Sequence, residues 1–192
     1  MTDAVHAGKR FNIYAIVSSI ALAVLLLYVG ESFSSIQQVL RSAGYVGTFV
    51  LGMLYAHGFT SLPAAALLFL MGRSQNLWLA GTVGTFGAVA SDLVMFVLFR
   101  SAKGFAEEHP HKKRYAGWWA AIDARIPPSW QPFVMIAVAA VFLLLPLPNE
   151  FADYLLARTR KVKASGVFVM SYVLNGISIS AILWLARFGG RR

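Results

Sequence analysis

The sequence predicts an all-α integral membrane protein, because its composition, its long apolar runs and the places of its prolines all favour that class. The chain has 192 residues, of which 58% are hydrophobic and only 13% are charged. So small a polar fraction cannot cover a water-soluble globule of this size, and the mean hydropathy of +0.63 agrees. Since a helix needs about 20 apolar residues to cross a bilayer, the chain has room for only a few crossings.

The net charge of +9 does not indicate a nucleic-acid partner. The lysines and arginines stand between apolar runs and do not gather along one amphipathic face, which is typical of membrane topology signals. The chain has no cysteine, which excludes disulfides, thiol chemistry and cysteine ligands for metals. His109 and His111 lack further ligands at a usable spacing, so no metal or other cofactor is expected.

The first predicted unit, residues 1–43, is an N-terminal transmembrane helix followed by a polar connection. Lys9 and Arg10 precede an apolar run over residues 11–29. This run is longer than the hydrophobic part of a secretory signal and lacks a convincing small-residue cleavage site, which favours a retained helix.

Residues 44–104 predict a broken hairpin followed by a full span. An apolar run starts near Tyr45 and breaks where polar residues and Pro63 would lie at the bilayer centre. A short apolar piece follows, and the run over residues 77–99 is then long enough to cross and closes on Arg100.

Residues 132–190 repeat this order. An apolar run breaks at Pro148, a short piece ends in basic residues, and a last span covers about residues 164–186. Between the two units, residues 105–131 carry apolar side chains at helical spacing, which predicts a cytoplasmic amphipathic helix on the membrane surface. Those side chains are Tyr115, Trp118, Trp119, Ile122 and Ile126. We expect this helix to anchor the loop, with gating of lipid headgroups as the alternative.

The two units correspond along the sequence at an offset of 85 residues. At this offset Pro63 falls on Pro148, and Gly81 falls on Gly166. The shared order of run, break, short run and span indicates an internal duplication. Pro-interrupted short segments at matching places in two halves are typical of a transport site.

Topology follows from the distribution of basic residues. If each broken segment is a re-entrant hairpin, each unit crosses once and the second unit is inverted relative to the first. One side of the membrane then carries 12 of the 17 basic residues and the other carries 5, against 10 and 7 for kinked spans. The positive-inside rule therefore predicts hairpins, with the N-terminus and central loop in the cytoplasm and the C-terminus outside. A prokaryotic plasma membrane is the expected location.

The returning arm of the second hairpin holds the strongest candidate site. Glu150 and Asp153 share one face of a helical arm, and Arg158 lies further along it. Asn149 stands between Pro148 and this pair. The carboxylates can bind a proton or a cation, or the arginine can hold a phosphate. Alternatively, Glu150 caps the half-helix and Asp153 pairs with Arg158 for stability.

Asp92 lies deep in the first span, where a charged group costs about 2.5 to 3.5 kcal/mol and therefore indicates function. Small residues precede it and permit close helix packing, so its side chain should point inward. Two interpretations remain open: a stabilising hydrogen bond or ion pair with Asn175 in the second span, and proton relay or substrate contact.

His57 and Ser61 at the first tip could form a Ser/His/Asp triad with Asp92. However, the chain has no Gly-x-Ser-x-Gly motif, and helical spacing favours a hydrogen bond between the two residues or to backbone freed by Pro63. We therefore expect no enzymatic activity.

These motifs resemble those of the DedA family, whose common region is also called the VTT or SNARE-associated domain. They are the two Pro-broken hairpins, the Gly-rich span that contains Asp92, and the tip Pro148-Asn149-Glu150. The resemblance covers about residues 44–190. It implies movement of lipids, as a phospholipid scramblase or a polyprenyl-phosphate flippase, sometimes coupled to protons. This chain departs from the family at the first tip, which lacks an acid, and at the second, which lacks the arginine-rich signature.

We therefore predict a membrane transporter that moves lipids, with both hairpin tips meeting near the bilayer midplane. The cavity between them would contain Glu150, Asp153, Asp92, His57 and Ser61. The expected partners are membrane lipids, protons or sodium as coupling ions, and further copies of the chain in a homo-oligomer. A small-molecule or ion transporter of the same fold and a non-transporting scaffold are the alternatives.

Overall fold

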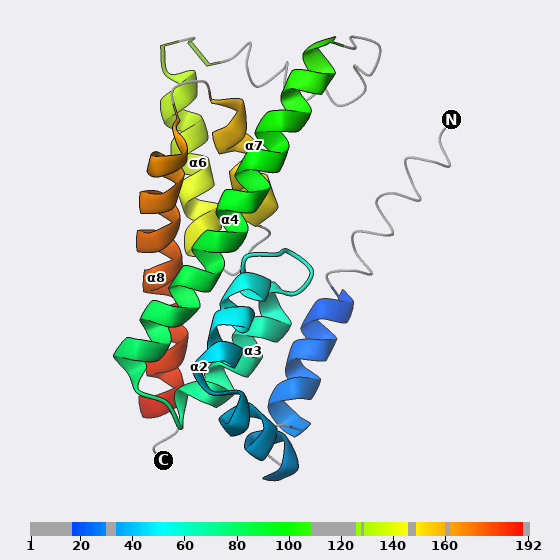
Figure 1. Ribbon diagram of the computed structural model, residues 1–192, viewed down its shortest axis with the longest axis vertical. Helices are drawn as coiled ribbons and strands as arrows, with labels where there is room; N and C mark the ends of the chain where they lie inside the picture. The colour runs from blue at the N-terminus through cyan, green and yellow to red at the C-terminus, as the bar shows by residue number, and fades with distance from the viewer. Residues whose placement is uncertain are drawn as a thin grey trace, which may run out of the picture.

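The computed structural model describes residues 17–29, 34–108, 126–127, 129–145, 149–159 and 162–189, without the side chains of residues 34–37, 40, 102–108 and 158. Within this part the chain forms seven helices and no strand, so the predicted all-α class is confirmed. Two long helices, α4 (Leu77–Glu108) and α8 (Ala164–Phe188), run antiparallel along most of the molecule (Figure 1). Four of the other helices form two hairpins beside them.

The first hairpin consists of α2 (Ser34–Tyr55) and α3 (Ser61–Gly72). The chain turns over residues 56–60, and Thr60 closes the turn by donating a hydrogen bond to the Leu54 carbonyl at 2.6 Å. Pro63 is the third residue of α3, where no intrahelical amide donor is needed. The break therefore lies before Pro63, which stands in the first turn of the returning arm and does not itself interrupt the run.

Helix α2 bends at Gly44, whose φ of 53° and ψ of −143° are accessible to glycine without strain. Gln75, in the turn before α4, holds this bend. Its amide nitrogen donates to the Gly44 carbonyl at 3.0 Å, and Thr48 Oγ1 donates to its amide oxygen at 2.7 Å. The bend separates the start of α2 from the hairpin at the residue where the first unit was predicted to begin.

The second hairpin consists of α6 (Gln131–Leu144) and α7 (Asn149–Arg158). Its tip residue Pro148 lies outside the described residues. So does almost all of the amphipathic helix predicted within residues 105–131. The two arms agree with the apolar run and the short piece expected on either side of the break.

The N-terminal helix is described over Val17–Val29. Its buried Ser19 donates a hydrogen bond to the Phe59 carbonyl at 2.8 Å, in the turn of the first hairpin. Lys9 and Arg10, which were expected to flank a full span here, lie outside the described part of the chain.

Two helices are long and apolar enough to cross a membrane, over Leu77–Ser101 and Ala164–Phe188. Each segment has 25 residues, or about 37 Å of helix, against about 30 Å for the hydrocarbon core of a bilayer. They coincide with the two full spans predicted from the sequence. Helix α4 itself continues past the predicted end at residue 99 to Glu108.

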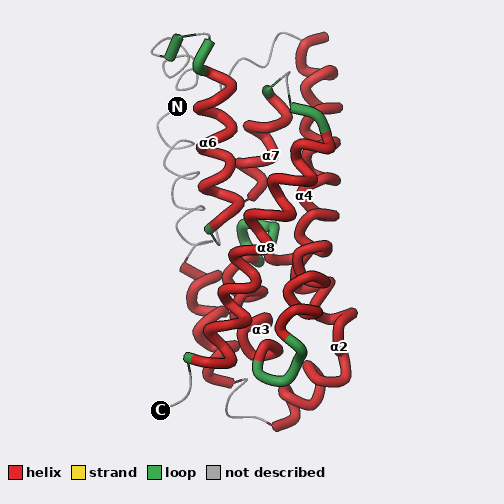
Figure 2. Tube along the Cα trace, turned by 90° about the vertical axis from the view of Figure 1, so that its left-hand side faces the viewer, coloured by secondary structure: helices red, strands yellow, loops and turns green. Residues whose placement is uncertain are grey.

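The two hairpins reach the middle of the molecule from opposite ends. Figure 1 shows α2 and α3 beside the lower half of the long helices and α6 and α7 beside the upper half, and Figure 2 agrees. Helix α4 packs against α2 and α7, while α8 packs against α3 and α6. The ends of the hairpin arms next to each turn therefore lie near mid-height, between the halves.

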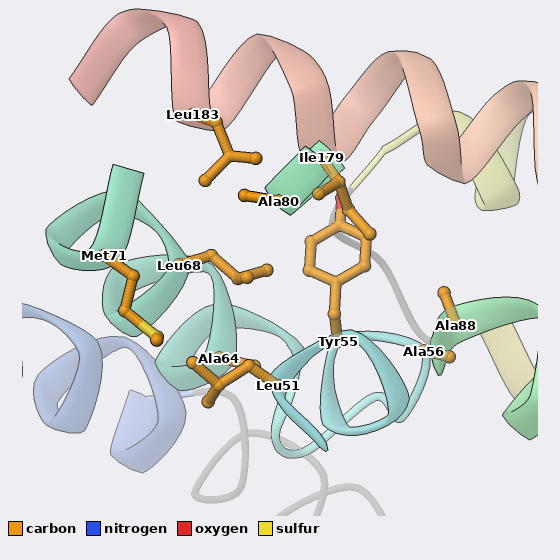
Figure 3. Packing of buried hydrophobic residues seen from close by; sticks show 10 residues of the cluster. All are labelled: Leu51, Tyr55, Ala56, Ala64, Leu68, Met71, Ala80, Ala88, Ile179 and Leu183. Atoms are coloured by element: carbon orange, nitrogen blue, oxygen red, sulfur yellow. The ribbon is translucent and has the colours of Figure 1, made fainter. Parts of the chain in front are cut away.

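The hydrophobic core has two parts, one for each hairpin. The first packs α2 and α3 against both long helices, and Figure 3 shows its members Tyr55, Leu68 and Ile179 converging. The second packs α6 and α7 around Phe96 of α4 and Val167 of α8. Because both parts use both long helices, neither half has a core of its own.

Burial relates the two long helices at an offset of 87 residues. They begin 87 residues apart, at Leu77 and Ala164, and every buried position of α8 except Ala186 falls on a buried position of α4. The buried pairs are Ala80 and Val167, Gly84 and Ser171, Ala88 and Asn175, Ser91 and Ser178, Asp92 and Ile179, and Phe96 and Leu183. The offset of 85 taken from the prolines is therefore two residues too small for the spans, and Gly81 does not correspond to Gly166.

Each long helix is also tied near its end to the turn that follows the other half's hairpin. Arg100 Nη1 donates to the Val162 carbonyl at 2.7 Å, and Arg187 Nη1 donates to the Gln75 carbonyl at 2.9 Å. The donors are 87 residues apart, and so are the acceptors. The two contacts are thus equivalent, and each hairpin is held by the long helix of the opposite half.

Helices α2 and α4 approach so closely that no side chain fits between them. A Cβ added to Gly52 would collide with the carbonyl group of Gly84, and one added to Gly87 would collide with that of Phe49. At Gly166, in the first turn of α8, the only neighbour that an added Cβ would meet is the Val162 side chain, at 3.9 Å.

We expect Gly52→Ala to lower the free energy of unfolding by about 2 kcal/mol, because the opposing backbone cannot move aside as a side chain can. Gly166→Ala should leave the stability unchanged or raise it, since alanine favours a helix. Thermal unfolding in detergent micelles compares the two variants. Equal Tm values would contradict the close contact between α2 and α4.

Candidate functional site

Buried polar side chains gather halfway along the two long helices. Asp92 is 0% exposed and lies 15 residues after Leu77 in α4, about 22 Å along the helix. Its Oδ2 accepts hydrogen bonds from Ser171 Oγ at 2.6 Å and Asn175 Nδ2 at 2.8 Å, both in α8. The predicted hydrogen bond between Asp92 and Asn175 is therefore present, and Ser171, one turn before Asn175, joins it.

Asn149, the first residue of α7, connects the second hairpin to these helices. Its Nδ2 donates to Asn175 Oδ1 at 3.2 Å and to Asp92 Oδ1 at 3.4 Å, and the side chain is fully buried. We call Asp92, Asn149, Ser171 and Asn175 the Asp92 network. It joins three helices through groups that have no access to water, so each hydrogen bond that is lost leaves a polar atom without a partner.

The two hairpin tips meet at the carboxylate of Glu150, in the first turn of α7. The backbone nitrogen of Gly58, in the turn of the first hairpin, donates to Glu150 Oε1 at 2.8 Å and to Oε2 at 3.0 Å. His57 Nδ1 lies 3.4 Å from Glu150 Oε1. We call His57, Gly58 and Glu150 the tip clasp. The sequence singled out His57 and Glu150, but a backbone amide such as that of Gly58 leaves no signal in a sequence.

Ser91 extends the clasp, because its Oγ lies 3.0 Å from His57 Nε2. The order Ser91, His57, Glu150 is that of a serine hydrolase triad. Ser91 is nevertheless only 3% exposed, and the Gly58 amide engages both carboxylate oxygens, so we interpret the row as a structural link. The triad considered from the sequence pairs His57 with Ser61 and Asp92, whereas the two His57 ring nitrogens lie next to Ser91 and Glu150.

Asp153 lies one turn after Glu150 and shares its face of α7. It is 1% exposed, and neither carboxylate oxygen has a hydrogen-bond partner within the described part of the chain. Asp153 lies near enough to Asp92 and Glu150 for like charges on these carboxyl groups to repel one another. Arg158, the expected partner of Asp153, ends α7, but its side chain lies outside the described residues.

A second contact joins the first hairpin to α8. The hydroxyl groups of Tyr55 and Ser178 share a buried hydrogen bond. Ser178 corresponds to Ser91 at the offset of 87 residues, so the last turn and tip of the first hairpin contact equivalent serines on both long helices. Sequence reasoning missed both serines, because a hydroxyl within an apolar run scarcely changes its hydropathy.

No protein-family model, no characterised protein and no solved structure matches this chain. The resemblance to the DedA family thus stays a prediction. Three features of the site bear on function. The buried Asp92 carboxylate, halfway along α4, is hydrogen-bonded. Glu150 joins the two hairpins, and the buried Asp153 carboxylate has no partner among the described residues.

We expect Ser171→Ala to lower the free energy of unfolding by about 1 to 3 kcal/mol, because it removes a donor from the buried Asp92 carboxylate. Ser165→Ala, the same change at an exposed position of the same helix, should change the stability by less than about 0.5 kcal/mol. Thermal unfolding in detergent measures both. If the two variants were equally stable, the Asp92 network would not contribute to stability.

Proposed function

We propose that this chain is a membrane transporter that moves lipids through the polar region between its two hairpin tips. The observation that carries the proposal is the tip clasp, in which Glu150 of one hairpin binds the Gly58 amide of the other. Two hairpins that meet from opposite ends at a polar site are typical of transporters, because opening either hairpin exposes the site to one side only.

The outer surface supports a lipid environment. Large apolar side chains on both long helices are exposed in the isolated chain, where water would make them costly. They include Trp78, Val94, Val97, Leu98, Val169, Val173, Ile177 and Trp184. Together with the two helices of membrane-crossing length, this surface favours an integral membrane protein.

The short hairpin helices favour re-entrant segments. The returning arms α3 and α7 have 12 and 10 residues, or about 18 and 15 Å, which is half of a bilayer core. Each arm therefore returns to the side from which its hairpin entered. With the correspondence at 87 residues, this supports an inverted repeat of hairpin plus span, with the N-terminus and the central loop in the cytoplasm.

Alternating exposure then requires the clasp to open. The side chains of His57 and Glu150 are 38% and 31% exposed, whereas Asp92 and Asp153 are buried. We infer that a headgroup reaches the buried acids by passing between the tips, a path that fits the movement of lipids implied by the resemblance to the DedA family. A small-molecule or ion transporter is the second candidate, favoured by the Asp153 carboxylate, which has no partner among the described residues.

The first test is movement of acyl-labelled fluorescent phospholipid across sealed liposomes that contain the purified protein. Glu150→Gln keeps the shape of the side chain but removes its charge, and we expect it to slow lipid movement by about tenfold or more. Arg41→Gln, which removes an exposed charge far along α2, should leave the rate unchanged. Monodisperse purification of all three proteins shows that folding is intact.

No movement above that of protein-free liposomes would overturn lipid transport. Substrate-dependent proton flux without lipid movement would support the small-molecule transporter. Equal rates of lipid movement for Glu150→Gln and the unmodified protein would show that the tip clasp does not take part in transport.

The inverted arrangement predicts that the turns after the two hairpins lie on opposite sides of the membrane. Arg73 follows α3 and Lys163 precedes α8, and both are exposed. Because the chain has no cysteine, the single variants Arg73→Cys and Lys163→Cys each offer one thiol. A membrane-impermeant maleimide should label Arg73→Cys from outside intact cells and Lys163→Cys only after lysis. Labelling of both from one side would contradict the inverted repeat.

A further inference from the structure

Charge is unevenly distributed between the site and the rest of the described chain. The acidic side chains that the structure describes are Asp92, Glu150 and Asp153, and all three lie at the site. The described basic side chains are exposed and belong to other places along the helices: Arg41, Arg73, Arg100, Lys163 and Arg187. Among described residues, only His57 can supply a positive charge to the site.

Among these three carboxylates, Asp153 has neither a hydrogen-bond donor nor a positive charge supplied by the described residues. The Asp92 carboxylate accepts three hydrogen bonds, and that of Glu150 is held by the Gly58 amide. Asp153 is buried one turn after Glu150 in α7, with no donor among the described residues. A buried carboxylate in apolar surroundings is strongly destabilising unless it takes up a proton, or unless a positive charge or hydrogen-bond donors reach it. A cationic donor that reaches Asp153 can therefore take the place of that proton.

The chemistry of the site distinguishes between headgroups. A phosphate brings only negative charge and acceptors, so three carboxylates repel it. An ammonium group brings positive charge and donors, which match the carboxylate of Asp153. A metal ion fits less well, since within the described residues no group of three His, Asp or Glu side chains could hold one.

We propose that the group bound at this site is an ammonium group, carried by a lipid headgroup or by a free amine, and that Asp153 is its counter-charge. This inference rests on the proposed transport function and names its substrate class. The ammonium group reaches Asp153 once the tip clasp opens, while the phosphate of an aminophospholipid stays outside the three carboxylates.

The test compares two acyl-labelled lipids that differ only at the amine: phosphatidylethanolamine and its N-acetylated derivative. Each lipid is added in trace amount to sealed phosphatidylglycerol vesicles that contain the full chain, and its movement between the two leaflets is measured. We expect the amine lipid to cross about tenfold faster, because acetylation removes the positive charge. Asp153→Asn should abolish this preference, and Arg41→Gln should preserve it.

Equal movement of the two lipids would overturn the ammonium inference and leave lipid transport standing. A preference that persists in Asp153→Asn would overturn the role of Asp153. The comparison of lipids on the unmodified protein needs no variant, so the inference can fail even if Asp153→Asn does not fold.

If neither lipid moves, lipid transport fails, and the free-amine source is tested by thermal stability in detergent. Stabilisation by ethanolamine hydrochloride over sodium chloride at equal concentration, lost in Asp153→Asn, would support the ammonium site with a free amine as its ligand. Equal effects of the two salts, or no effect of either, would overturn the ammonium site as well.

Discussion

A single buried carboxylate, that of Asp92, sets the relation between the long helices and the second hairpin. In apolar surroundings its lone pairs must be satisfied by protein donors, and these come from α7 and α8. Asn149 is one of the donors and also the first residue of α7, so the network fixes where the returning arm begins. Glu150, the next residue, is thereby placed where it reaches the Gly58 amide of the first hairpin.

The two halves have corresponding helices but different polar residues. At the offset of 87 residues the burial pattern and the terminal arginine contacts correspond, yet Asp92 is matched by Ile179 and Ser171 by Gly84. The polar network therefore exists once, on the side of the second hairpin. In the first half its place is taken by close backbone contact between α2 and α4, which needs glycine. One half thus serves mainly for packing, and the other supplies the ionisable groups.

Sequence reasoning succeeded where a residue stands out against an apolar background. Charge in a hydrophobic run singled out Asp92 and Glu150, and composition with chain breaks located the helices. The helix ends were less accurate, since α4 continues past its predicted end at residue 99 to Glu108 and α2 begins at Ser34, before the predicted start near Tyr45. It missed Ser91 and Ser171, because a hydroxyl hardly changes hydropathy, and the Gly58 amide, because every residue except proline has one. Which groups meet depends on packing between segments far apart in the chain, and that information is not local.

The polar groups of the site differ in their exposure, and this difference suggests which of them a ligand contacts first. The side chains of His57 and Glu150 in the clasp are partly exposed, whereas Asp153 and the Asp92 network are buried. Because the Gly58 amide engages both oxygens of Glu150, a substrate that takes over this carboxylate competes with the amide for it. A ligand that enters has to compensate Glu150 for the lost amide contact, and only a donor of hydrogen bonds or positive charge does so. Closure and binding therefore compete for one side chain, which is the physical basis for coupling the hairpins to the occupancy of the site.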